Sequence, residues 1–148
     1  MFKTPYFVLL VHAATTLALA GIIWFVQIVH YPLFPRLQSG AFASFQEESM
    51  RRTGWVVAPL LAVETVTALF LLWRRPPGLP LPLAVAGLSL VVVNWLSTLF
   101  LQMRQHRALS KGFNHYAYRA LVATNWIRTL TWTARGAVVL WMISLTAN

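Results

Sequence analysis

LPLAVAGLSLVVVNWLSTLFLQM, residues 81–103, decides the fold class of this 148-residue chain. The stretch contains no Asp, Glu, Lys or Arg, and as a helix it would be about 35 Å long at ~1.5 Å per residue. The hydrocarbon core of a bilayer is about 30 Å thick, so roughly 20 apolar residues are enough to cross it. The sequence therefore predicts a membrane-spanning helix here.

Three other stretches of the chain are as long and almost as apolar. They cover residues of about 5–30, 54–73 and 120–146. Pro32 and Pro35 mark the end of the first stretch, because proline cannot continue the hydrogen bonding of a helix. We therefore predict an all-α protein with one domain, residues 1–148, built as an integral membrane bundle of four transmembrane helices.

The connecting segments predict the topology. RRPPGLPLP at 74–82 is typical of a tight turn. Residues 41–52 predict a short amphipathic helix, with Glu47–Arg51 and Glu48–Arg52 one turn apart. The loops after the first and third spans hold most of the basic residues: Arg36, Arg51, Arg52, Arg104, Arg107, Lys111 and Arg119. The other side holds Lys3, Arg74 and Arg75. Because basic loops stay in the cytoplasm, we expect both termini outside a bacterial inner membrane.

Composition excludes several classes of function. Only 10% of the residues are charged and 58% are hydrophobic, which leaves too little charge for the surface of a soluble domain. The formal net charge of +9 does not indicate nucleic-acid binding, because the basic residues flank apolar runs and form no continuous face. Since the chain has no cysteine, disulfides and cysteine-ligated metals are excluded.

Each predicted span carries polar residues on one helix face. Ionisable groups in membrane helices turn toward the bundle interior or a cavity, because lipid does not solvate them. The faces hold His12, Thr16, Gln27 and His30; Glu64 and Thr67; Asn94, Thr98 and Gln102; and Asn125, Arg128, Trp132 and Arg135. Most of these residues lie toward loops one and three. We expect a pocket at that end between spans one, three and four, closed by Tyr31, Gln46, Arg51, Arg52 and His115.

The residue types in this pocket indicate its chemistry. His30 and His106 can exchange protons near neutral pH, and Arg128 can hold substrate oxygens through charge-assisted hydrogen bonds. We expect these three to be catalytic. The expected substrate-binding residues are Gln27, Gln102, Asn125, Trp126 and Trp132, the last two by ring stacking. The alternative is that polar groups only join the helices by hydrogen bonds and that Arg128 extends to lipid headgroups.

Two further predictions concern buried charge and a cofactor. Glu64 and Arg135 fall near the middle of their spans, where each charge would need the other, so they predict a structural ion pair. His30 and His106 lie at the same end of two different spans, and one imidazole from each could ligate haem b. Whether any cofactor is bound stays open.

Two families share motifs with the chain. HRALSKGFN at 106–114 and NWIRTLTWTAR at 125–135 resemble the closing segment of the small four-span bacterial membrane proteins grouped with anthrone oxygenases. Asn125, Arg128 and Thr129 match the Asn-x-x-Arg-Thr pattern of that family. GIIWFVQIVHYPLFPRL at 21–37 and FQEESMRRTGWVVAPLLAVE at 45–64 look loosely like HemJ-type protoporphyrinogen oxidases. The second span departs from those oxidases in having Glu64 and no lysine.

These resemblances imply a membrane oxidoreductase or oxygenase that acts on a flat, lipophilic, aromatic or quinone-like molecule. One alternative is a non-catalytic subunit, or a pigment- or lipid-binding scaffold, of a larger membrane complex. Another is a small dimeric transporter, in which Glu64 and Arg135 would be the coupling pair. The expected partners are the lipid bilayer and a lipophilic small molecule, while a homo-oligomer or larger assembly stays open.

Overall fold

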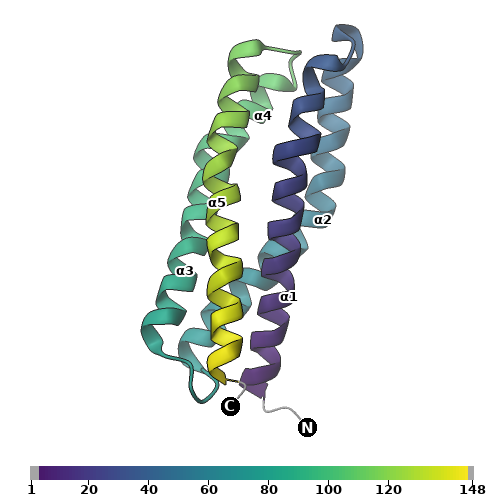
Figure 1. Ribbon diagram of the computed structural model, residues 1–148. Helices are drawn as coiled ribbons and strands as arrows, with labels where there is room; N and C mark the ends of the chain where they lie inside the picture. The colour runs from purple at the N-terminus through teal and green to yellow at the C-terminus, as the bar shows by residue number, and fades with distance from the viewer. Residues whose placement is uncertain (1–3, 147–148) are drawn as a thin grey trace.

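The computed structural model describes residues 4–146, which are helical over most of their length and contain no β-strand. Four long helical rods stand side by side (Figure 1). The rods are α1 (Thr4–Phe25) with η1 (Val26–His30) and η2 (Tyr31–Arg36); α2 (Ser39–Trp73); α3 (Leu81–Leu96) with η3 (Ser97–Gln102) and α4 (Met103–Leu109); and α5 (His115–Thr146). The predicted all-α bundle is confirmed.

The rods are arranged so that each packs against two others. The first rod lies against α2 and α5, and the third rod also lies against α2 and α5. The start of α1, the α2–α3 turn and the end of α5 share one end of the bundle, while the η2–α2 and α4–α5 connections share the other (Figure 1). Consequently α2 and α5 face each other diagonally, and a side chain joining them must cross the bundle centre.

Three of the rods are long and apolar enough to cross a membrane: Thr4–Arg36, Gly40–Trp73 and Leu81–Leu109. The fourth, α5, is less apolar because its inner face carries Asn125, Arg128 and Arg135, all buried. It runs the length of the bundle beside α1 and α3 (Figure 1). Its outward face carries exposed apolar side chains such as Leu130 and Leu140. The chain therefore has the features of a membrane protein.

The second rod differs from its prediction. Residues 41–52 do not form a separate helix, because α2 is continuous from Ser39 to Trp73 through Gly54 and Pro59. The polar segment forms the N-terminal part of the same helix, on which Glu48 bonds both Arg51 and Arg52. Glu48–Arg52 was expected, whereas Arg51 pairs with Glu48 at three residues' spacing instead of with Glu47.

Three other boundaries also lie outside the predicted ranges. The first rod continues through Pro32 and Pro35 as 3₁₀ turns to Arg36, and the third continues to Leu109. The fourth helix begins at His115, one residue after Asn114, whose Oδ1 accepts a hydrogen bond of 3.0 Å from the Ala117 backbone N–H. Such N-terminal capping satisfies a donor that has no partner within the helix.

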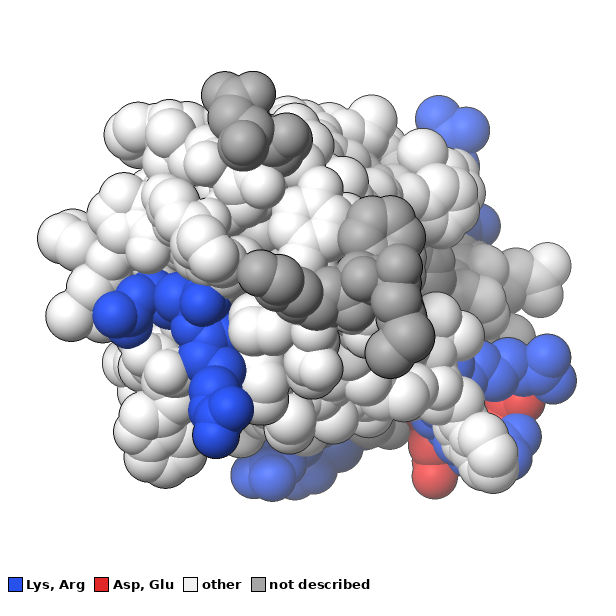
Figure 2. Space-filling view, turned by 90° about the horizontal axis from the view of Figure 1, so that it is seen from below, with Lys and Arg blue, Asp and Glu red and all other residues white. Residues whose placement is uncertain are grey.

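The α2–α3 turn depends on one glycine. Gly78 has a φ of 87°, a conformation that L side chains rarely adopt, and a Cβ there would lie 2.6 Å from the Leu145 carbonyl oxygen. The tight turn predicted at 74–82 is therefore present and packs against the end of α5. Figure 2 shows this end as a largely uncharged surface with basic side chains in a few places.

Apolar clusters occupy both ends of the bundle. Near the α2–α3 turn the buried residues are Leu9, Ala13, Leu71, Leu79, Val139 and Met142. At the opposite end they are Tyr31, Phe34, Phe42, Leu109, Ala117 and Leu121, which we call the closing cluster. Its Phe34 and Phe42 rings meet edge to face, with centroids 5.6 Å apart. Most of the buried polar groups lie between these clusters.

Candidate functional site

A cavity of about 370 Å³ lies between the rods, in the half of the bundle next to the closing cluster. Its walls are mainly apolar, and pockets of this size commonly hold small molecules. The apolar lining includes Leu19, Ile23, Val57, Leu61, Leu99 and Met103. A pocket was expected at this end between spans one, three and four. One long wall, however, comes from α2, which the prediction did not include.

Five of the predicted functional residues line this cavity: His30, Gln102, His106, Arg128 and Trp132. Gln27 and Asn125 lie behind Arg128, where both are buried and bonded to each other. Trp126 is 38% exposed and meets Trp24 edge to face at 5.7 Å. Trp126 is therefore outside the cavity, on the surface of α5, and cannot stack on a molecule bound there.

Arg128 is a buried cation with weak compensation. Its side chain is 9% exposed, its Nη1 donates to Asn125 Oδ1 at 3.4 Å, and Asn125 Nδ2 donates to Gln27 Oε1 at 2.8 Å. The guanidinium also lies 5.2 Å from the ring centre of Trp132. Its Nε, however, has no hydrogen-bond partner.

Among residues 4–146, no carboxylate pairs with Arg128. Glu48 is bonded to Arg51 and Arg52 at the surface, Glu64 is bonded to Arg135, and Glu47 is exposed on α2. An uncompensated charge in an apolar interior is costly, by several kcal/mol in proteins. Arg128 therefore provides a strong attraction for an anionic or electron-rich oxygen in the cavity.

His106 is held by two side chains that also line the cavity. Gln46 Nε2 donates to His106 Nδ1 at 2.8 Å, and the Tyr31 hydroxyl lies 3.2 Å from His106 Nε2. Gln46 is fully buried, and its Oε1 has no partner. If the Gln46 amide is turned over, its Oε1 can accept a hydrogen bond from a protonated Nδ1 of His106. The amide orientation and the histidine tautomer change together.

The residues expected to close the pocket divide into two groups. Tyr31 and Gln46 do close it, whereas Arg51 and Arg52 point to the surface and bond Glu48. His115 lies at the start of α5 against Phe113, with ring centres 4.9 Å apart, and does not line the cavity. The other α2 residues that line it, such as Ser49, were not predicted, because the second span was expected to begin only at residue 54.

The two histidines do not fit the haem prediction as they are arranged. Both ring nitrogens of His106 are occupied, by Gln46 and Tyr31, so binding iron would require breaking a hydrogen bond. His30 Nε2 is bonded to Ser49 Oγ at 3.0 Å. Across the described part of the chain, no group of three or more His, Cys, Asp and Glu residues could hold a metal ion. We therefore derive no step through haem.

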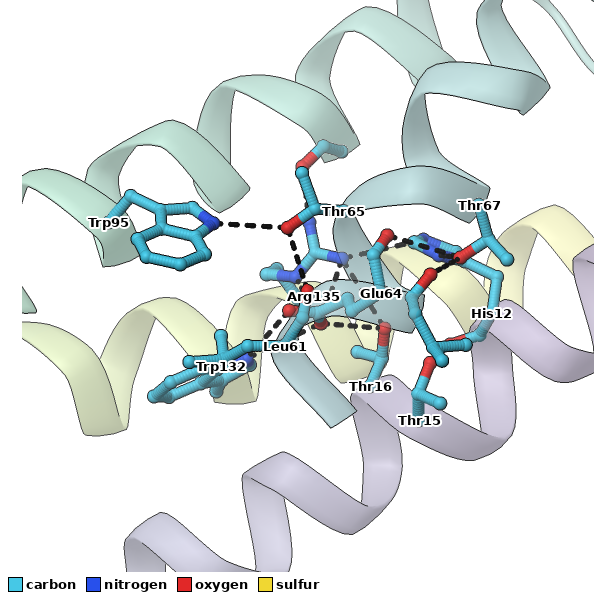
Figure 3. Close-up of polar contacts among 12 residues, drawn as sticks. His12, Thr15, Thr16, Leu61, Glu64, Thr65, Thr67, Trp95, Trp132 and Arg135 are labelled. Atoms are coloured by element: carbon cyan, nitrogen blue, oxygen red, sulfur yellow. Dashed lines mark hydrogen bonds and ion pairs between the residues drawn. The ribbon is translucent and has the colours of Figure 1, made fainter. Parts of the chain in front are cut away.

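The second buried arginine is fully compensated. Arg135 Nη2 lies 2.9 Å from Glu64 Oε1, across the bundle centre, as the prediction of an ion pair requires. Arg135 also donates to Thr16 and to the Gly87 carbonyl, and Glu64 accepts from Thr16 at 2.9 Å (Figure 3). Trp132 Nε1 lies 3.3 Å from both Glu64 oxygens. Trp132 therefore connects this cluster to the cavity, since its ring lies beneath Arg128.

Comparisons with known proteins found no relative from which the role of this site could be inferred. No protein-family model, no curated protein and no solved structure matches the chain. The resemblance to anthrone oxygenases and to HemJ-type oxidases stays an expectation from short motifs.

Proposed function

We propose that the protein is a membrane oxidoreductase or oxygenase that binds a lipophilic, ring-bearing molecule in this cavity through an anionic or electron-rich oxygen. The observation that carries the proposal is Arg128, a buried guanidinium with no carboxylate partner among the described residues, in a largely apolar cavity. A charge-assisted hydrogen bond from arginine to a ligand oxygen is stronger than a neutral one. The apolar walls hold the rings.

We call Tyr31, His106 and Gln46 the proton relay, because these three residues would carry the proton away from the substrate. With the Gln46 amide turned over, Nδ1 of His106 carries the proton and donates it to Gln46 Oε1, so Nε2 is free to act as the acceptor. A substrate proton then passes to the Tyr31 oxygen while the Tyr31 proton moves to His106 Nε2, over a contact of 3.2 Å. The resulting imidazolium keeps the Nδ1–H bond to Gln46 Oε1, an oxygen that otherwise lacks a partner. Arg128 stabilises the oxyanion left on the substrate, because its charge is already in place before the reaction.

An oxygenase reaction at a ring methylene group would then need dioxygen as the oxidant. The electron pair released by deprotonation passes to dioxygen. One oxygen atom remains on the carbon as a carbonyl, and the other leaves as water with the two hydrogens of the methylene group. Arg128 and the Tyr31–His106 contact act on the substrate itself, so this scheme assigns no role to a metal.

The binding step can be tested with a matched pair of probes. A 2-hydroxy-3-alkyl-1,4-naphthoquinone is anionic at neutral pH, and its 2-methoxy analogue is neutral. We expect the anion to bind the purified protein more tightly by about tenfold to a hundredfold, the range of one charge-assisted hydrogen bond. Arg128→Gln should remove this difference. Equal binding of both probes by the wild-type protein would refute the role of Arg128.

Turnover can be tested with an anthrone as substrate. Oxygen uptake and the appearance of the anthraquinone chromophore should exceed the uncatalysed rate, which is measured without protein. Tyr31→Phe keeps the ring in the closing cluster but removes the hydroxyl that bonds His106, so it should slow turnover and leave probe binding unchanged. Probe binding without any turnover would favour the alternative of a ligand-binding scaffold.

We further propose that the end with the closing cluster faces the cytoplasm of a bacterial inner membrane, which puts both termini outside. Exposed Arg104, Arg107 and Lys111 lie at that end, and Arg74 lies at the other, while Lys3 is outside the described residues. The native chain has no cysteine, so single-cysteine labelling is unambiguous.

In intact spheroplasts, an impermeant maleimide should miss Lys111→Cys and label the control Pro77→Cys, which lies in the exposed part of the α2–α3 turn. Permeabilisation should make Lys111→Cys reactive. The opposite pattern would reverse the proposed orientation.

A further inference from the structure

The cavity reaches the outer surface of the bundle between α2 and η3. Ala58 and Ala62 of α2 and Leu99 of η3 line the cavity and are also exposed, Leu99 by 53%. Side-chain hydrogen bonds join α2 to the third rod on either side of this place, from Trp95 to Thr65 at 3.0 Å and from Gln46 to His106. Within residues 4–146, none joins α2 to η3 itself. The two segments are therefore free to separate there.

Both walls of this opening have features that keep it wide. On α2, the residues at successive turns are Gly54, Ala58 and Ala62, which have small side chains or none. A Cβ added at Gly54 would meet no atom within 4 Å, so the space beside it is open. The opposite wall, η3, is a π-helix, a wider turn that is rare and often occurs at functional sites.

The cavity has no comparable path to water at the nearer end of the bundle. The closing cluster covers it, and the exposed fractions of Tyr31, Phe34 and Phe42 are 3%, 1% and 0%. Toward the other end, the cavity floor is Trp132, and beneath it lies the Glu64–Arg135 cluster. A molecule that enters the cavity from either end of the bundle would have to displace one of these packed groups.

The rim of the opening is apolar. The exposed side chains at the same level of the bundle are apolar, among them Val56 and Val63 on α2 and Leu96 and Phe100 on the third rod. No residue between 53 and 63 or between 95 and 103 is ionisable. Such a surface is suited to contact with lipid chains, whereas the rim of an aqueous entrance would carry polar or charged groups.

We propose that this opening is a lateral portal, through which a lipophilic ring-bearing ligand passes between the bilayer and the cavity. The portal rests on the proposed function in that the cavity holds such a ligand, and it adds the route. Arg128 then lies inside, so a ligand that partitions into the lipid reaches the cation without crossing water. Ala58 and Ala62 control the width of the route.

The test measures rates of ligand exchange in lipid nanodiscs. The probe is the 2-hydroxy-3-alkyl-1,4-naphthoquinone, which quenches the fluorescence of the tryptophans that line the cavity, Trp95 and Trp132. Ala58→Phe and Ala62→Phe narrow the portal, and Leu99→Ala widens it. Val66→Phe is the matched control, because Val66 is on the same helix, 65% exposed and outside the cavity lining.

Ala58→Phe and Ala62→Phe should each lower the association and dissociation rates of the probe together, by about tenfold. The Kd should stay within about threefold of the wild-type value, because a barrier slows entry and exit equally. Leu99→Ala should raise both rates, and Val66→Phe should change neither. Unchanged rates in Ala58→Phe and Ala62→Phe, or faster dissociation alone, would overturn the portal while wild-type binding still supports the proposed function. A change of oligomeric state in Ala58→Phe would also overturn it, by making the opening a contact between copies. Failure of the wild-type protein to bind the probe would refute the proposed function itself.

Discussion

The free energy of the Glu64–Arg135 pair can be measured by a double-mutant cycle. The variants are Glu64→Leu, Arg135→Leu and the double variant, because leucine fills part of the space without a polar group. Removing either charge leaves its partner buried and uncompensated, which costs about 3–5 kcal/mol. Glu64→Leu also leaves the Thr16 hydroxyl and the Trp132 N–H without their acceptor, at about 1–3 kcal/mol for each donor that stays unpaired. The single variants should therefore be strongly destabilised, Glu64→Leu the more so.

The double variant should be less destabilised than the sum of the two single variants, by about 2 kcal/mol or more, because no unpaired charge remains. The assay is unfolding by SDS in mixed micelles, followed by far-ultraviolet circular dichroism. The exposed pair Glu48–Arg52 serves as a control, and its cycle should show little coupling because water screens the two charges. If the Glu64 and Arg135 effects simply add, the two side chains are not partners and the placement of α2 opposite α5 is wrong.

Three further predictions concern the cavity. Arg128→Lys should weaken retention of the anionic naphthoquinone, by no more than the roughly tenfold to hundredfold expected for Arg128→Gln, because lysine keeps the charge but lacks the planar fork of donors. The melting curve should stay nearly unchanged, and wild-type retention would make the arginine a headgroup anchor. Asn125→Ala should weaken the same binding less, by about 1 kcal/mol, because Asn125 does not line the cavity and acts only through its hydrogen bond to Arg128. His106→Gln should lower turnover by about 10²–10⁴-fold, the usual contribution of general acid–base catalysis. Its Kd for the probe should stay within a few-fold in equilibrium titrations, and unchanged turnover would contradict the relay.

Local patterns along the chain predicted much of the fold. The absence of charge in 81–103 and the breaks at prolines located four rods, and the polar positions on their faces identified residues that are in fact buried, such as Glu64 and Arg135. The boundaries were predicted less well. The prediction ended each span where its apolar run ends, but hydrogen bonding continues as long as neighbouring rods pack against the helix, as α2 does from Ser39.

The candidate site could be predicted only in part, because its contacts join distant segments. His106 and Arg128 were identified by their chemistry, but the relay partners Tyr31 and Gln46 come from a different rod in each case. Trp126 was expected to stack on a ligand ring, but it lies on the exposed side of α5, since successive residues on a helix point in different directions. No local pattern shows that α2 forms a wall of the cavity.

By itself, the sequence determined that the chain is a helical membrane protein and that its last helix carries two arginines on one face. Arg128 and Arg135 are seven residues apart, so the helical period places them on the same face and does not distinguish them. Similar depth in the membrane predicted the pair of Arg135 with Glu64, but only the tertiary structure shows that Arg128 is left without a carboxylate and faces an apolar cavity. The physical reason is that the pairing of two side chains on different rods depends on how far each rod is shifted along the bundle axis. We call this shift the height of the rod. Those heights follow from side-chain packing between rods and from the π-helical turns η1 and η3, which shift the register locally.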